Sequence, residues 1–252
     1  MSTVLADWDQ GEFSAEGFTR TVYRRGRGPG VIVIHEVPGI TPAVTAFAND
    51  VVACGFTVLM PSLLGTPGRS MSMPYAMSSM ARVCVSKEFA TWATRRTSPI
   101  IAWLRALAKQ LHQEVGGPGV GAVGMCFSGG FALAMMVDET MVAPVLSQPS
   151  LPLAFFGKEQ GADLGISDED AQLVQKRAAA GCQVLGLRYT GDSLVGTRFE
   201  SLRRLLGDAF LAVELPSRSV FDHSVLTEQR DEPSVQRVLQ FFRQKLQPSQ
   251  QA

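Results

Sequence analysis

Short apolar runs separated by helix-like stretches recur along the chain and place the strongest limit on its fold. The clearest run, "GVIVIHEVPG" at 30–39, is rich in β-branched residues and ends in a Pro-Gly turn. Such a run is typical of a strand buried on both faces. Parallel strands need crossover connections, which helices usually supply. The alternation therefore predicts a doubly wound, mostly parallel sheet flanked by helices.

The helix-like stretches carry end signals. Thr41 can cap the helix that follows the first run, and Pro42 suits its first position, where a missing N–H has no partner to lose. A second helix is predicted to open at Ser167, before three acidic residues, and the last one at Pro233. Further strands are predicted at 55–61, 120–125, 141–147, 182–192 and 210–217, and further helices at 131–138 and 198–207.

Length and charge favour one domain with a small-molecule ligand. The 252 residues are 46% hydrophobic, enough to bury a sizeable core as a single domain over 1–252. Lys plus Arg and Asp plus Glu both total 23, so no basic surface favours nucleic acid. No apolar stretch reaches the ~18 residues of a membrane span, and the first ten residues do not resemble a secretion signal. We expect a cytoplasmic protein that acts without a membrane, as a monomer or a homodimer.

Two segments stand apart from the alternation. Residues 62–97 hold several methionines with little clear periodicity, so we treat them as a candidate lid or substrate-binding segment. Residues 247–252 are expected to form a disordered tail. The four cysteines are widely separated and only three histidines are present, so neither a metal site nor a disulfide framework is expected.

Ligands of such sheets bind beyond the carboxyl ends of the strands, and four chemically active side chains follow predicted strands. Glu36 ends the first run and Cys126 follows the run at 120–125. Asp192 ends the run at 182–192, and His223 lies in the loop after 210–217. One edge of the sheet is thus expected to hold two carboxylates, a thiol and an imidazole.

The stretch "GMCFSGG" has the composition of a nucleophile elbow, a tight strand-to-helix turn with small residues two positions on either side of the nucleophile. Cys126 fits, with Gly124 before it and Ser128 after it. Ser128 offers a competing frame with Gly130, but that frame would place Cys126 where glycine is preferred. The pattern therefore favours Cys126.

On these residues the chain resembles the dienelactone hydrolase family of the α/β-hydrolase fold, whose members place cysteine in a G-x-C-x-G elbow. The resemblance extends over roughly 15–246, through "HEVPGI", "GMCFSG", "YTGD" and "DHS" in the family's order. It implies an α/β-hydrolase fold, no cofactor, and a triad of Cys126, Asp192 and His223. It also implies that Glu36 holds the resting thiol or accepts its proton.

The chemistry of these groups agrees with those roles. A free thiol with a pKa of about 8.5 is mostly protonated at neutral pH and needs a base to become nucleophilic. His223 would accept the thiol proton, while Asp192 would fix the imidazole tautomer. The backbone N–H groups of Phe127 and Val37 would receive the oxyanion. The expected reaction is cleavage of a small ester or lactone through a thioester acyl-enzyme.

The substrate is less constrained. Family members that act on dienelactone hold its carboxylate with two arginines, and Arg82, with Tyr75 nearby, is the candidate for the first contact. The second is missing, because Thr227 lies four residues past His223 and the nearest downstream arginine is Arg230. Dienelactone is the leading substrate by resemblance.

Other interpretations stay open. A general esterase or thioesterase would share the triad, and a non-enzymatic ligand-binding protein or thiol redox sensor would retain Cys126. His35 is expected to be structural, because it faces the side of its strand opposite to Glu36. Asp222 competes with Asp192 as partner of His223, although adjacency makes the contact with Nδ1 awkward.

Overall fold

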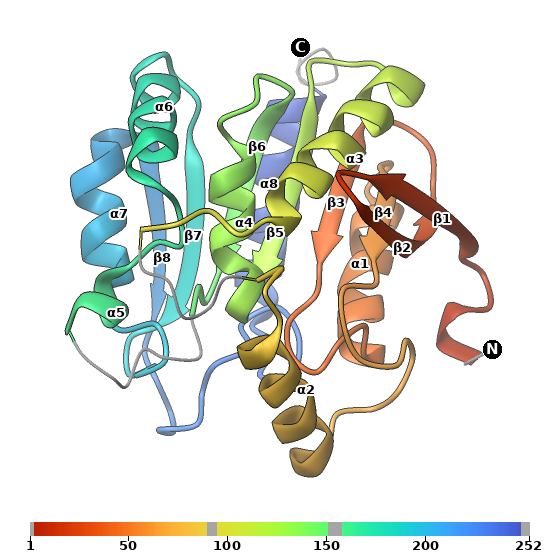
Figure 1. Ribbon diagram of the computed structural model, residues 1–252, viewed down its shortest axis with the longest axis horizontal. Coiled ribbons are helices and arrows are strands. Elements are labelled where there is room, and N and C mark those ends of the chain that lie inside the picture. Colours follow the sequence, from red (N-terminus) through yellow and green to blue (C-terminus); the bar gives the residue numbers. More distant parts are fainter. Residues whose placement is uncertain (1–2, 90–94, 151–157, 248–252) are drawn as a thin grey trace.

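The computed structural model describes residues 3–89, 95–150 and 158–247 (Figure 1). Within these ranges the chain forms an eight-stranded sheet in the order β1-β2-β4-β3-β5-β6-β7-β8. The strands are β1 (Asp9–Ala15), β2 (Phe18–Arg25), β3 (Gly30–Ile34), β4 (Thr57–Pro61), β5 (Val120–Met125), β6 (Met141–Ser147), β7 (Val184–Tyr189) and β8 (Phe210–Leu215). This is the α/β-hydrolase fold that the sequence indicated.

The pairing is parallel from β4 through β8, as predicted, whereas β1 and β2 add an antiparallel edge. At the centre, β3 and β5 pair with Ile34 opposite Gly124. Two residues further along each strand, Glu36 and Cys126 leave the sheet at the same place. The register of the central pair thus brings two of the expected site residues to one edge.

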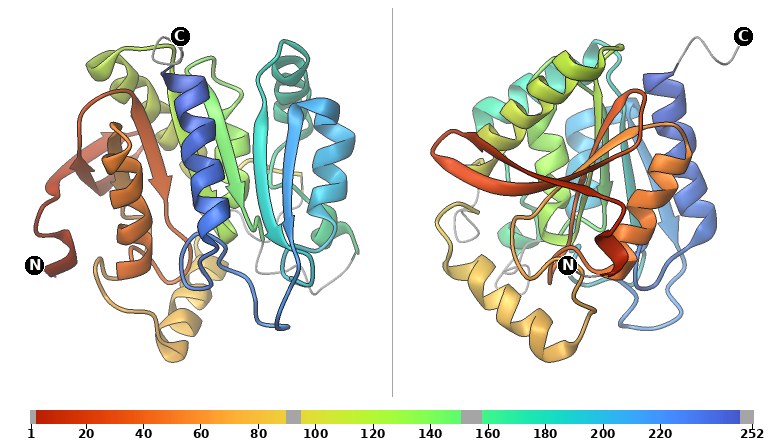
Figure 2. Two further views of the ribbon diagram at one scale, coloured as in Figure 1. Left: turned by 180° about the vertical axis from the view of Figure 1, so that it is seen from behind. Right: turned by 90° about the vertical axis from the view of Figure 1, so that its right-hand side faces the viewer.

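Helices cover both faces of the sheet (Figures 1 and 2). One face carries α1 (Pro42–Ala53) and α8 (Glu232–Leu246). The other carries α3 (Ile100–Val115), α4 (Gly129–Met135), α6 (Asp168–Ala179) and α7 (Arg198–Leu206). The short α5 (Lys158–Ala162) contacts α7, and α2 (Met73–Val85) projects beyond the carboxyl ends of the strands.

Alternation along the central strands divides the core into two layers. In β3, Val31 and Val33 pack under α1 and α8, whereas Ile32 and Ile34 pack under α3 and α4. All four are fully buried. Truncating one such side chain to alanine typically costs about 2–5 kcal/mol. The strand that positions Glu36 is therefore anchored in both cores.

The helix ends follow the expected signals closely. The Thr41 hydroxyl accepts a hydrogen bond from Val44 N at 3.3 Å, and the Ser167 hydroxyl accepts one from Asp170 N at 3.1 Å. The last helix begins one residue before the expected Pro233, because Asp231 caps it through Ser234 N. The strand predicted at 30–39 is shorter, since it ends at Ile34 and the chain turns away from the sheet.

The two unusual segments are partly described. Within 62–97, α2 is the regular element, and residues 90–94 lie outside the described part. The disordered tail was predicted to start at residue 247, but Gln247 is the C-cap of α8. Its side chain donates to Gly55 O at 3.3 Å. Residues 248–252 lie outside the described ranges. No helix in the described part of the chain has the length and apolarity needed to cross a membrane.

Candidate active site

Cys126 occupies a strained turn between β5 and α4. Its φ is 56°, in the left-handed region that residues with a side chain seldom adopt. The turn is tight, because a Cβ placed on Gly124 would lie 2.0 Å from Ser128 O. Glycine is therefore required two residues before the thiol, as expected for a nucleophile elbow.

Ser128, the competing nucleophile, serves the backbone instead. Its fully buried hydroxyl accepts a hydrogen bond from Met125 N at 2.9 Å and lies 3.1 Å from both Ile34 O and His35 O. These contacts join the end of β3 to the elbow. The geometry thus favours Cys126 over Ser128 as the apex of the turn.

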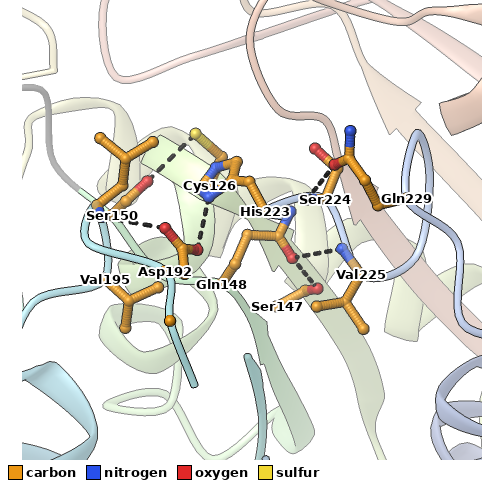
Figure 3. Close-up of polar contacts among 12 residues, drawn as sticks. Cys126, Ser147, Gln148, Ser150, Asp192, Val195, His223, Ser224, Val225 and Gln229 are labelled. Carbon is orange, nitrogen blue, oxygen red and sulfur yellow. Dashed lines mark hydrogen bonds and ion pairs between the residues drawn. The ribbon is translucent and has the colours of Figure 1, made fainter. Parts of the chain in front are cut away.

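Asp192 and His223 come together from the connections that follow β7 and β8 (Figure 3). His223 Nδ1 lies 2.7 Å from Asp192 Oδ2, and the other carboxylate oxygen accepts a hydrogen bond from Leu194 N at 3.0 Å. The rival acid, Asp222, is occupied in its own turn, where it accepts from Arg218 N at 2.6 Å and Ser219 N at 3.0 Å. Asp192, and not Asp222, is therefore the partner of His223 Nδ1.

The surroundings of His223 favour its protonated form. Burial lowers the pKa of His223, but the negative charge of the nearby Cys126 sulfur and the bond to Asp192 outweigh it. The net pKa lies well above 6.5. The ring nitrogen Nε2 is buried, and the charge of the sulfur raises the pKa of His223 more than the direct contact with Cys126 does. Cys126 therefore acts on this imidazole mainly as a neighbouring charge.

Glu36 is buried in a polar network beside this pair. Gln148 Nε2 donates to Glu36 Oε2 at 3.1 Å, the Ser224 hydroxyl donates to the same oxygen at 2.7 Å, and the Thr227 hydroxyl donates to Oε1. Both carboxylate oxygens are thus engaged by uncharged donors. In this arrangement Glu36 holds the loop after His223, and in the described residues it makes no hydrogen bond to Cys126.

The Cys126 sulfur receives its hydrogen bond from a residue that sequence reasoning missed. The Ser150 hydroxyl donates to Sγ at 3.2 Å, and Ser150 N donates to Cys126 O at 3.0 Å (Figure 3). Gln148, in the same turn, was also missed. Both lie just after β6, so their place beyond a strand end was the one available signal.

His35 has the structural role that was expected. Leu63 N donates to His35 Nε2 at 3.1 Å, so Nδ1 carries the proton and donates to Glu36 O at 2.8 Å. Burial lowers the pKa of His35 to about 4. The ring is therefore neutral at pH 7 and connects β3 to the segment after β4. Within the described ranges, no three His, Cys, Asp or Glu side chains gather as candidate metal ligands.

The two expected oxyanion donors flank the elbow. Phe127 follows Cys126 and packs edge-on against Phe89 and Phe131, with ring centroids 5.6 Å apart in each pair. Val37 follows Glu36 and precedes a cis peptide bond to Pro38. Their positions after β5 and β3 are those that the prediction needs, and the use of their N–H groups stays a prediction.

Of the two candidate substrate-binding residues, Tyr75 is held by contacts within the protein and Arg82 is exposed. The Tyr75 hydroxyl accepts a hydrogen bond from Thr66 N at 2.5 Å, and the Arg69 guanidinium lies 4.3 Å from the Tyr75 ring centroid. Tyr75 is therefore committed to the segment before α2. Arg82 is exposed on α2.

Thr227 and Arg230, the two residues considered at the place of the second arginine, are both engaged by other side chains. Thr227 contributes its hydroxyl to Glu36, whereas Arg230 pairs with Asp50 at 2.8 Å and Glu232 at 2.9 Å. Arg230 is thus engaged at the start of α8, away from the carboxylate network.

The model of the dienelactone hydrolase family matches residues 17–175, more than half of the chain. The chain belongs to the dienelactone hydrolase family. This dienelactone hydrolase family member is accordingly a carboxylic ester hydrolase. A search of curated protein sequences gives no match.

Solved structures show the same fold for this member of the dienelactone hydrolase family. A putative dienelactone hydrolase from Klebsiella pneumoniae is 18% identical, with a TM-score of 0.61 over 94% of this chain and 98% of that one. A dienelactone hydrolase from Anabaena variabilis is 14% identical, with a TM-score of 0.62 over 95% and 99%. A zinc-bound cold-adapted esterase from an Arctic intertidal metagenomic library is 14% identical, with a TM-score of 0.59 over 95% of each chain.

Proposed function

We propose that this protein hydrolyses a small ester or lactone with Cys126 as nucleophile, His223 as general base and acid, and Asp192 as the group that orients the imidazole. The observation that carries the proposal is the 2.7 Å contact between His223 Nδ1 and Asp192 Oδ2, made beside a thiol on a left-handed turn. An acceptor on Nδ1 leaves Nε2 to exchange a proton with the reacting groups.

In the acylation half, His223 Nε2 takes the thiol proton and Cys126 Sγ attacks the carbonyl carbon of the substrate. The C=O electron pair moves to oxygen, and the N–H groups of Phe127 and Val37 stabilise the resulting charge. Collapse of this intermediate breaks the ester C–O bond, and His223 gives its proton to the departing oxygen. An alcohol leaves, or in a lactone stays attached through the acyl chain.

In the deacylation half, water attacks the thioester while His223 takes one of its protons. The second tetrahedral intermediate then breaks the C–S bond. Sulfur leaves with the electron pair and regains a proton from His223, which releases the carboxylic acid. A thiolate is a good leaving group, so this half-reaction suits cysteine as well as the first does.

Dienelactone is the leading substrate because of the family. A general esterase acting on uncharged esters is a second candidate, supported by the engagement of Thr227 with Glu36 and of Arg230 with Asp50. A carboxylate substrate would have lost one of its two expected cationic contacts. A cytoplasmic location is part of the proposal, since a reducing compartment helps to keep the four free cysteines from oxidation.

The test is steady-state hydrolysis of cis-dienelactone, trans-dienelactone and p-nitrophenyl acetate by the wild type, Cys126→Ala, His223→Ala and Cys54→Ala. Loss of at least about 10³-fold in kcat/KM for the first two variants, with Cys54→Ala unchanged, supports the proposal. Turnover of the acetate alone moves the assignment to a general esterase. Wild-type rates in Cys126→Ala would exclude the thiol mechanism.

A further inference from the structure

We propose that Ser150 is a further catalytic residue, one that donates a hydrogen bond to the Cys126 sulfur and stabilises its thiolate form. This inference rests on the proposed role of Cys126 as nucleophile. The Ser150 hydroxyl lies 3.2 Å from Sγ, and the residue is only 6% exposed. In the described part of the chain, the sulfur is the sole hydrogen-bond partner of this hydroxyl.

The donor is held in place by the packing of its own turn. Ser150 N donates to Cys126 O at 3.0 Å, so the backbone as well as the side chain meets the elbow. A Cβ on Gly129 would lie 2.5 Å from Pro149 Cα, which shows how closely the turn packs on the start of α4. The absence of a side chain at position 129 therefore permits the approach that brings Ser150 to the thiol.

The preceding residue fixes the turn from the other side. Gln148 has a left-handed φ of 33°, and its backbone N donates to Leu187 O at 2.7 Å. Its side chain donates to Glu36. The same side chain accepts from Val225 N at 3.3 Å, two residues after His223 (Figure 3). The turn that carries Ser150 is thus attached both to β7 and to the loop that carries His223.

The chemical effect follows from the charge of the acceptor. A hydrogen bond to an ionised acceptor is roughly twice as strong as one to a neutral acceptor. Ser150 therefore favours the thiolate over the thiol before attack. The same bond helps sulfur to leave with its electron pair when the acyl-enzyme breaks down. Both effects require no proton to pass through Ser150.

Other groups act on the same sulfur and are retained when Ser150 is changed. His223 approaches it from the connection after β8, with Asp192 behind the ring. Arg198, buried on α7, also interacts with Cys126 electrostatically, and Glu36 lies in the network attached to Gln148. The contribution of Ser150 to the stability of the thiolate is therefore measured by changing Ser150 alone and leaving these four side chains in place.

The experiment measures the rate at which iodoacetamide alkylates Cys126 as a function of pH, followed by mass spectrometry in the full-length wild type, Ser150→Ala and Ser147→Ala. Ser147→Ala is the matched control, because it removes a buried hydroxyl of the same segment that bonds Gln148 rather than sulfur. We expect the alkylation midpoint of Ser150→Ala to rise by about half a unit to one unit, that is ~3- to 10-fold less thiolate below the midpoint. Ser147→Ala should follow the wild type.

A second pair, Ser150→Thr and Ser150→Val, repeats the comparison with side chains of equal shape, and decides the question if the alanine variant fails to fold. The inference is supported if the alkylation midpoint of Ser150→Thr stays low, as in the wild type, and that of Ser150→Val is raised. Overlapping profiles in folded variants would overturn it. If hydrolysis survives in Cys126→Ala while the Ser150 shift is found, the proposed function fails and the hydrogen bond to the thiolate stands.

Discussion

His223 Nδ1 lies 2.7 Å from Asp192 Oδ2, although the two residues are 31 positions apart and belong to the ends of different strands. The second oxygen of the carboxylate is held by Leu194 N, so the acid has one orientation open to the ring. This pair fixes the orientation of the His223 ring before any substrate arrives. The imidazole therefore presents Nε2, and only Nε2, to the elbow.

Replacing Asp192 by Asn tests the orientation of the imidazole. The amide can donate a hydrogen bond to Nδ1, which would put the ring proton on Nε2 and prevent it from accepting the thiol proton. We expect kcat for p-nitrophenyl acetate to fall by about 10²–10⁴-fold. Asp222→Asn is the control and should stay within about threefold of the wild type, because Asp222 bonds only its own turn.

The charge of Cys126 is expected to govern the protonation of His223. In Cys126→Ala the pKa of His223 should fall, because burial still lowers it while the sulfur charge that raises it is gone. The imidazole C–H resonances of the wild type and the variant, followed by NMR against pH, measure this directly. If the pKa of His223 were the same in both proteins, Asp192 and not Cys126 would be the group that raises it.

The buried His35 is expected to make the folded protein less stable in mild acid. The folded pKa of about 4 lies below the unfolded value of 6.5, so below pH 6.5 the unfolded chain binds a proton that the folded chain does not. Stability is lost as the pH falls through this window, by on the order of 2 kcal/mol between pH 7 and pH 5. His223, with its raised pKa, changes in the opposite direction.

The quantity to measure is therefore the difference between the wild type and His35→Gln in urea unfolding at pH 7 and pH 5. Gln keeps an acceptor for Leu63 N but does not titrate. The variant should lose less stability on acidification than the wild type does. Parallel pH dependence in both proteins would remove His35 as the cause.

Arg198 is expected to hold the segment behind Asp192. Its guanidinium is buried and donates to four carbonyl oxygens, those of Gln160, Asp163, Leu194 and Val195. Burial lowers its pKa to about 10, which leaves it charged at pH 7. Arg198→Lys cannot reach all four and should cost about 2–4 kcal/mol in urea unfolding. The exposed Arg204→Lys should change stability by less than about 0.5 kcal/mol.

Arg82 can be tested as a carboxylate contact. If this exposed cation binds the dienelactone carboxylate, Arg82→Ala should raise KM for dienelactone by about tenfold and leave that for p-nitrophenyl acetate unchanged. Lys87→Ala, which removes an exposed charge shortly after α2, is the control. An equal change for both substrates would indicate a disturbance of α2 instead of a lost ionic contact.

The sequence indicated the parallel part of the fold well because its signals are local. The β-branched run in β3, the cap at Thr41 and the small residues of the elbow each act over a few positions. The antiparallel edge was missed because β2 pairs with β4 at long range, with Val22 opposite Pro61. The sequence of β2, FTRTVYRR, shows no regular alternation of polar and apolar residues and does not by itself reveal that partner.

The site divides in the same way. The places of Glu36, Cys126, Asp192 and His223 at strand ends follow from the topology, which the sequence could predict. The partners of Glu36 and the contact of Ser150 with sulfur could not be predicted, because they depend on how the turn at 148–150 packs on Gly129 and on the loop after His223. Such contacts are set by tertiary packing alone.

The Ser128 hydroxyl, which links the end of β3 to the elbow, makes the floor of the site a single rigid unit. Neither central strand can shift at this edge without breaking that link. By contrast, α2 and the connection between β8 and α8 project beyond this unit from the same edge of the sheet (Figure 1). Changes in these projecting segments should therefore leave the geometry of the elbow intact.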